Sequence, residues 1–178
     1  MQILYSTDEK LMRVNRLLRF DKYIKAKRLL EEILEEQPDH AVAHVHMAEI
    51  YAHQLTDTEM SEYHYRLAIK FDPQLVTAWY GYQQLLLYKS EHAALVQLAE
   101  EALYIKNIYR PAIYKTLGMS CEEQQKFRKA IKYFEKALSY SVYEFECDHI
   151  KKSIERNQQK LNKKKGKSSA EKKKEAVK

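Results

Sequence analysis

The chain has 178 residues and a net charge of +6, with three Gly, three Pro and two Cys. Strong helix formers such as Leu, Ala, Glu and Lys are abundant and alternating runs of β-branched residues are lacking, so we predict an all-α fold. No apolar run approaches the ~20 residues that cross a bilayer. Residues 1–6 do not resemble a secretory signal, so we expect a cytoplasmic protein without a transmembrane segment.

Four pairs of amphipathic helices are predicted in chain order, because apolar residues recur at steps of three and four. The four units span approximately 7–40, 41–75, 76–109 and 111–142. Ser6 and Glu9 have the spacing of a capping box, which places the start of the first helix after Ser6. Aligning the second helices superimposes Ile33, Ala68, Ala102 and Ala137, at intervals of 35, 34 and 35 residues. This regular period predicts a solenoid in which each pair packs only against its neighbours.

Histidine and cysteine residues do not have the spacing of a metal site. His40 and His44 lie one helical turn apart, but no Cys or carboxylate joins them at ligand spacing. Cys121 and Cys147 are too few for a disulfide framework and form no CxxC motif. We therefore predict no metal site, and we interpret His44 as a packed core residue.

A further helix is predicted after the last pair, over residues 143–161. Phe145, Ile150 and Ile154 give this helix an apolar edge that is expected to cap the exposed end of the stack. The lysine-rich segment 162–178 has almost nothing to bury, so we predict a flexible tail that is disordered or a frayed helix when unbound.

The positive charge is concentrated at the C-terminus. Residues 1–150 carry 19 Lys and Arg against 22 Asp and Glu, whereas residues 151–178 carry 12 against 3. The predicted basic tail comprises Lys163, Lys164, Lys165, Lys167, Lys172, Lys173 and Lys174. The chain therefore combines a mildly acidic body with a cationic extension.

The last predicted unit has a characteristic order of large and small residues. Its first helix carries Tyr114, Leu117, Gly118 and Cys121, and its second carries Ala130, Phe134 and Ala137. This pattern resembles the tetratricopeptide repeat, and the resemblance extends over roughly residues 7–142. It implies a right-handed solenoid of about four antiparallel helix pairs. Small residues at the helix crossings let the backbones approach closely, and aromatic residues fill the gaps.

The resemblance also implies a concave groove lined by the first helix of each unit. The candidate groove residues at the matching positions are Val45, Glu49, His53, Tyr80, Gln84, Tyr88, Lys115 and Met119. Other matching positions are Val42, Ala52, Thr77, Leu87, Ala112, Glu122 and Glu123. Such a mixed, aromatic surface suits an extended peptide or a helix of a partner protein. The alternative is that Tyr80 and Tyr88 only pack between neighbouring helices.

No catalytic residue, cofactor site or metal site is predicted, because the chain lacks a glycine-rich phosphate loop and an activated nucleophile. The leading hypothesis is therefore a non-enzymatic adaptor that binds a protein partner in the groove. The alternative is a nucleic-acid- or ribosome-associated factor that uses weak phosphate contacts of the basic tail. A solubilising tail, tail binding to anionic lipid, and self-association through the ends of the stack remain open as well.

Overall fold

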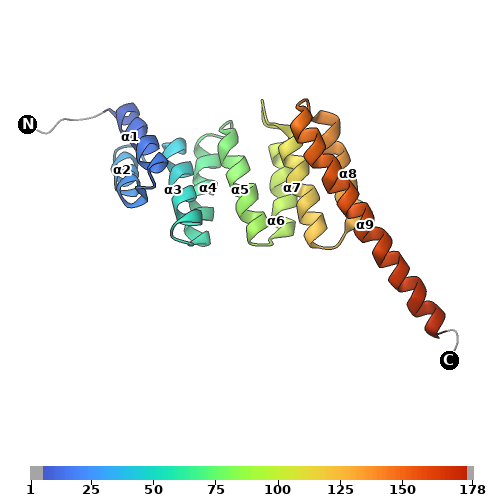
Figure 1. The fold of residues 1–178 in the computed structure, drawn as a ribbon. Coiled ribbons are helices and arrows are strands. Elements are labelled where there is room, and N and C mark those ends of the chain that lie inside the picture. Colours follow the sequence, from blue (N-terminus) through green and yellow to red (C-terminus); the bar gives the residue numbers. More distant parts are fainter. Residues whose placement is uncertain (1–5, 176–178) are drawn as a thin grey trace, which may run out of the picture. The chain divides into compact units, whose positions relative to one another are not determined.

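The computed structural model describes residues 6–175, with side chains as far as residue 164. All regular structure in this part of the chain is α-helical (Figure 1). Its nine helices are α1 (Thr7–Arg19), α2 (Tyr23–Glu36), α3 (Ala41–His53), α4 (Thr58–Phe71), α5 (Val76–Tyr88), α6 (His92–Ala102), α7 (Arg110–Glu123), α8 (Phe127–Tyr140) and α9 (Glu144–Glu175). The predicted all-α helical repeat fold is confirmed.

The chain forms two compact units. One contains residues 1–89 with 105–107, and the other contains residues 90–104 with 108–178. Helices α1 to α5 therefore belong to the first unit and α6 to α9 to the second. The division into repeats over 7–142 and the right hand of the solenoid remain predictions.

In the first unit, consecutive helices pack against one another. α1 pairs with α2 and α3 with α4, while α2 packs on α3, and α5 packs on both α3 and α4. Apolar residues at helical spacing form the core under α1 to α3, namely Val14, Ala26, Leu30, Ile33, Ala43, Met47 and Ile50. Burial of each of the larger side chains among them contributes about 1.5–3 kcal/mol, which offsets the entropy of ordering the helices.

Equivalent residues of successive repeats make equivalent hydrogen bonds. His44 Nε2 donates to the carbonyl oxygen of Pro38 at 2.9 Å, and Trp79 Nε1 donates to that of Pro73 at 2.9 Å. Trp79 lies 35 residues after His44, and Pro73 lies 35 residues after Pro38. The sequence period is therefore also a structural period, and each bond ties a first helix to the loop that precedes it.

Four of the connections between consecutive helices follow the same period. Asp21, Thr56, Ser90 and Gln125 have positive φ angles of 55, 51, 56 and 55°, respectively. A left-handed residue at this point reverses the chain within a short turn. The capping box at Ser6 is also present, because Glu9 N donates to Ser6 Oγ at 3.3 Å and Ser6 N donates to Glu9 Oε2 at 2.8 Å.

In the second unit, α7 packs on α6 and α8, and α8 packs on α9. A Cβ atom at Gly118 would lie 2.7 Å from Phe134 Cε1, so only glycine lets the Phe134 ring lie directly on α7. Phe134 is fully buried in a cluster with Cys121, Ala130, Ala137 and Ile150. Ile150 comes from α9, which therefore covers the apolar surface of the α7–α8 pair.

One feature of α9 differs from expectation. Phe145 is 78% exposed and contacts His149 of its own helix instead of the core, because it lies on the outer side of α9. The helix also continues beyond residue 161 to Glu175, since Lys, Glu and Ala favour helix and no proline interrupts this segment. The boundary between a capping helix at 143–161 and a tail at 162–178 remains a prediction.

Candidate binding groove

A groove of about 750 Å³ lies between α3 and α5 in the first unit. We call it the α3–α5 groove. Its lining consists of Glu49, Ala52, His53, Thr56, Tyr65, Thr77, Tyr80, Gly81, Gln84, Leu85 and Tyr88. Residues four apart share one face of a helix, which brings Glu49 with His53, and Tyr80 with Gln84 and Tyr88, to the same opening.

The side chain of Tyr65 reaches the groove from α4. A Cβ atom at Gly81 would overlap the Tyr65 phenol ring, so the glycine lets that ring lie against the backbone of α5. The ring also stacks on Tyr82, with 6.3 Å between ring centroids. Burial, and then the charge of Glu49, raise the pKa of the Tyr65 phenol far above its ordinary value of 10.0. Tyr65 therefore remains protonated and able to donate a hydrogen bond.

A partly buried carboxylate, that of Glu62, holds α5 in place. Tyr82 Oη donates to Glu62 Oε1 at 2.8 Å, and Lys89 Nζ donates to Glu62 Oε2 at 2.5 Å. Burial raises the pKa of Glu62, but the bonds from Lys89 and Tyr82 lower it more, so the pKa is below its ordinary value. The charged Glu62 thus connects α4 to the middle of α5 through Tyr82 and to the C-terminal end of α5 through Lys89.

The structure brings together five of the eight predicted groove residues. Glu49, His53, Tyr80, Gln84 and Tyr88 all line the α3–α5 groove.

The other three candidates lie elsewhere. Val45 is buried with 4% exposure, because it faces the core side of α3. Lys115 and Met119 belong to α7 in the second unit, where Lys115 Nζ lies 3.7 Å from Glu146 Oε1 and Met119 is 37% exposed.

Tyr65 and Gly81 were missed from the sequence. Both residues line the groove, although neither is among the candidate groove residues that the family resemblance implied. The available signal was Gly81 itself, since an isolated glycine inside an apolar helix often marks a close approach of another group.

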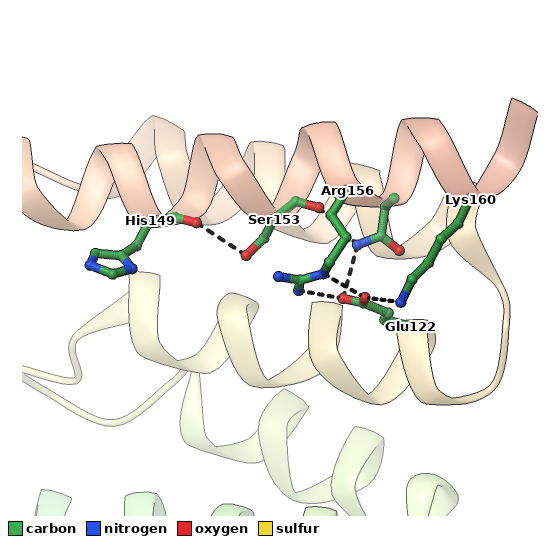
Figure 2. Close-up of polar contacts among 6 residues, drawn as sticks. Glu122, His149, Ser153, Arg156 and Lys160 are labelled. Carbon is green, nitrogen blue, oxygen red and sulfur yellow. Dashed lines mark hydrogen bonds and ion pairs between the residues drawn. The ribbon is translucent and has the colours of Figure 1, made fainter.

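In the second unit, the face of α7 that carries Glu122, a position of the expected groove surface, is in contact with α9 (Figure 2). Arg156 donates from Nε and Nη2 to the two carboxylate oxygens of Glu122, at 2.8 and 2.7 Å. Asn157 Nδ2 donates to Glu122 Oε2 at 2.9 Å, and Lys160 Nζ donates to Glu122 Oε1 at 2.6 Å. These bonds, chiefly those of Arg156, lower the pKa of Glu122 to about 2. The charged Glu122 therefore holds α9 on α7.

A second carboxylate anchors the start of α9. Glu146 Oε2 accepts hydrogen bonds from the hydroxyl groups of Tyr109 and Ser141. Burial raises the pKa of Glu146, but Ser141, Tyr109 and the nearby Lys115 ammonium together bring it below its ordinary value. Lys115 and Glu122, two positions of the expected groove surface, are thus engaged by the chain's own helix.

The histidines of the second repeat have structural partners. His44 donates through Nε2, so its Nδ1 accepts from His64 Nδ1 at 2.9 Å. Burial lowers the pKa of both rings, that of His64 to about 4. His40 Nδ1 accepts from the N–H of Ala43 at the start of α3. Within the described residues, no three His, Cys, Asp or Glu side chains gather to hold a metal ion.

Residues 111–141, which cover most of α7 and α8, match the family model of the tetratricopeptide repeat. The chain has a tetratricopeptide repeat fold. PilF from Pseudomonas aeruginosa is 20% identical, with a TM-score of 0.70 over 87% of this chain and 73% of that one. MamA from Desulfovibrio magneticus RS-1 is 17% identical, with a TM-score of 0.65 over 86% and 90% of the two chains.

A third similar structure is YrrB, described as a tetratricopeptide repeat protein with an unusual peptide-binding site. It is 12% identical, with a TM-score of 0.66 over 81% of this chain and 73% of that one. No curated protein sequence is significantly similar to this chain. At these identities the similarity establishes the tetratricopeptide repeat fold. In the described residues no helix is both long enough and apolar enough to span a membrane.

Proposed function

We propose that the chain is a non-enzymatic adaptor and that the α3–α5 groove binds a peptide or helix of a partner protein. The observation that carries the proposal is the convergence of Glu49, His53, Tyr80, Gln84 and Tyr88 on one groove of about 750 Å³. Binding sites for small ligands commonly have volumes of ~300–1,000 Å³.

The chemistry of the lining supports peptide binding. Tyr88 is 76% exposed, so much of its ring is available to be covered by a partner. Tyrosine has few rotatable bonds and a large apolar surface, which makes it one of the residues that contribute most to interfaces. Glu49 and Gln84 supply polar atoms beside these rings that can fix the register of a bound chain.

The arrangement of α9 limits the proposal to the first unit. Lys115 and Glu122 already contact α9, so the equivalent surface of α7 is not offered as the partner site. In this proposal the repeats within 7–142 carry the binding site, and the helix over 143–161 covers the apolar surface of the last helix pair, α7 and α8. YrrB has the same fold and is described as having a peptide-binding site, which supports the plausibility of a groove ligand.

The test is a double substitution, Tyr80→Ala with Tyr88→Ala. Proteins captured from native extract by the full chain are compared with those captured by this variant and by Tyr63→Ala. Tyr63 is a matched control because it is 54% exposed and lies on α4 outside the groove lining.

A partner retained by Tyr63→Ala and lost from the double variant is then purified for titration. We expect its affinity to fall about ten-fold or more, because each truncated aromatic anchor costs at least about 1 kcal/mol. Circular dichroism checks that the double variant keeps its helix content. Equal affinity for wild type and the double variant would contradict the groove as the site.

A second candidate function is binding to the phosphate backbone of nucleic acid through the C-terminal basic residues. Lys163 and Lys164 are exposed on α9, whereas the side chains of Lys165, Lys167, Lys172, Lys173 and Lys174 lie outside the described part. The exposed surface of α8 adds Arg128, Lys129, Lys132 and Lys136 in the same unit.

Salt dependence tests this second candidate. Binding to a random-sequence RNA of about 30 nucleotides should weaken steeply between 50 and 200 mM salt, because each phosphate contact releases a counterion. Replacing Lys163 and Lys164 by Gln should reduce the salt slope. A slope that does not change would contradict a role of these lysines in binding.

A further inference from the structure

The two helices that form the walls of the α3–α5 groove carry no lysine or arginine. The sequence of α3 is AVAHVHMAEIYAH and that of α5 is VTAWYGYQQLLLY. Their single acidic residue, Glu49, lines the groove. Over residues 41–88 the chain has only two Lys or Arg, Arg66 and Lys70, both on α4, against five Asp or Glu.

Three tyrosine rings surround the opening near this carboxylate. Tyr65, Tyr80 and Tyr88 all line the groove together with Glu49. The faces of aromatic rings attract cations, and the methylene stem of Lys or Arg packs well along such rings. A carboxylate beside tyrosine rings therefore offers both a partner for a positive charge and an apolar surface for its stem.

The Glu49 carboxylate is accessible and has a defined orientation. Its side chain is 46% exposed, and Oε2 lies 3.1 Å from His46 Nδ1, one turn earlier on the same helix. Glu49 and Tyr65 line the same groove, and the charge of Glu49 adds to burial in raising the pKa of the Tyr65 phenol. An incoming cation can reach it without displacing a lysine or arginine of the lining.

From these observations we infer that the α3–α5 groove recognises a lysine or arginine side chain in an extended segment of a separate partner protein. The positive charge pairs with Glu49, and the stem lies against Tyr80 and Tyr88. This inference rests on the proposed function, because it names the partner chemistry of the same groove. An acidic peptide would place its carboxylates near Glu49 with no lysine or arginine in the described lining to offset them.

The experiment uses the full chain and a displayed library of random dodecapeptides as the probe. Peptides are selected on wild type, on Glu49→Gln, on Glu49→Lys, and on Tyr80→Ala with Tyr88→Ala. Glu59→Gln is the matched control, since Glu59 is exposed on α4 and does not line the groove. Thermal melting verifies that each variant is folded.

We expect Lys or Arg to be enriched about five-fold or more at one peptide position on wild type and on Glu59→Gln. The enrichment should disappear on Glu49→Gln and change to Asp or Glu on Glu49→Lys. Replacing the selected Lys or Arg by Gln in a synthetic peptide should weaken binding about ten-fold, as measured by fluorescence polarisation.

The selected peptides distinguish failure of this inference from failure of the proposed function. Peptides that require Tyr80 and Tyr88 but show no Lys or Arg preference would overturn the inference and leave the groove as a binding site. If no selected peptide depends on Tyr80 and Tyr88, both are overturned. Light scattering that shows a dimer abolished by Glu49→Gln would reassign the occupant to a second copy of this chain and overturn the choice of a separate partner.

Discussion

The two carboxylate oxygens of Glu122 in α7 accept parallel hydrogen bonds from Nε and Nη2 of Arg156 in α9, at 2.8 and 2.7 Å. This bidentate geometry fixes both distance and orientation between the helices. The Glu122 side chain is only 12% exposed, so its charge depends on these partners for stabilisation. The pair therefore couples the position of α9 to the end of α7.

Replacing Glu122 by Gln should loosen α9. The amide cannot accept the same set of charged hydrogen bonds, and Arg156 and Lys160 lose their common partner. We expect a loss of about 2 kcal/mol in the free energy of unfolding. Hydrogen exchange of α9 amides between residues 144 and 164 should accelerate more than exchange in α3.

Glu123→Gln is the control for this substitution, because the neighbouring side chain is exposed. Its exchange pattern should match that of wild type. Unchanged protection of α9 in Glu122→Gln would show that the apolar contacts of Ile150 and Ile154 suffice to hold the helix.

Because His44 and His64 are buried, we expect the folded chain to lose stability in mild acid. Burial, followed by the charges of His44 and Lys27, lowers the pKa of His64 from 6.5 in the unfolded chain to about 4. Between pH 6.5 and pH 4 the unfolded state binds more protons than the folded state. The contribution of His64 to the free energy of unfolding is therefore fully present above pH 6.5 and decreases as the pH falls towards 4. The contribution from His64 is about 3 kcal/mol at most.

Urea unfolding at a series of pH values measures this effect. His64→Gln removes the titrating ring and should flatten the dependence of unfolding free energy on pH between 6.5 and 4. His53→Gln, at an exposed position of α3, should leave that dependence unchanged. An identical pH slope in wild type and His64→Gln would exclude His64 as its source.

Ser61→Ala should stabilise the chain. Ser61 is fully buried in α4, and its Oγ has no hydrogen-bond partner among the described residues. Ala26 and Ala130 occupy the equivalent places in other repeats and are also fully buried. Removing an unsatisfied hydroxyl and adding a better helix former should gain about 1 kcal/mol, or about 3 °C in Tm.

Differential scanning calorimetry on wild type and Ser61→Ala measures the change. Ser139→Ala, at an exposed position of α8 where the hydroxyl donates to the carbonyl oxygen of Lys136, is the control for the same substitution at a satisfied hydroxyl. A lower Tm for Ser61→Ala than for wild type would mean that the hydroxyl contributes favourably to the fold.

Gly118→Ala should destabilise the α7–α8 pair despite the better helix propensity of alanine. The new methyl group would lie 2.7 Å from the position now held by Phe134 Cε1. Overpacking costs about 1–3 kcal/mol and the propensity gain is about 1 kcal/mol, so we expect a net loss of about 1 kcal/mol.

A double-mutant cycle with Phe134→Leu isolates the contact. The leucine should cost less in the Gly118→Ala background than in wild type, with a coupling of about 1 kcal/mol. Additive effects of the two substitutions would show that the Phe134 ring relaxes away from α7 without cost.

Much of the fold followed from sequence period alone. Small and aromatic residues, such as Gly118 and Phe134, recur with the helical and repeat periods, so the sequence predicted that they lie at helix crossings. The capping box at Ser6 is likewise a contact between residues three apart. Five groove residues on α3 and α5 followed from the resemblance to the tetratricopeptide repeat, carried over position by position.

Residue exposure could not be derived in this way. Val45 has the same register position as Tyr80, yet it is buried, while Phe145 is exposed on a helix whose Ile150 is buried. These differences depend on the angle at which one helix lies on the next, and that angle is set by the packing of many side chains.

The sequence by itself determined an all-α helical repeat fold with a period of about 35 residues, because period and propensity are local properties. Only the tertiary structure decided that Tyr65 enters the α3–α5 groove over Gly81, and that Glu122 holds α9 instead of facing an open groove. Such contacts join residues 16 and 34 positions apart, and they form only when packing brings separate helices within hydrogen-bond or van der Waals distance.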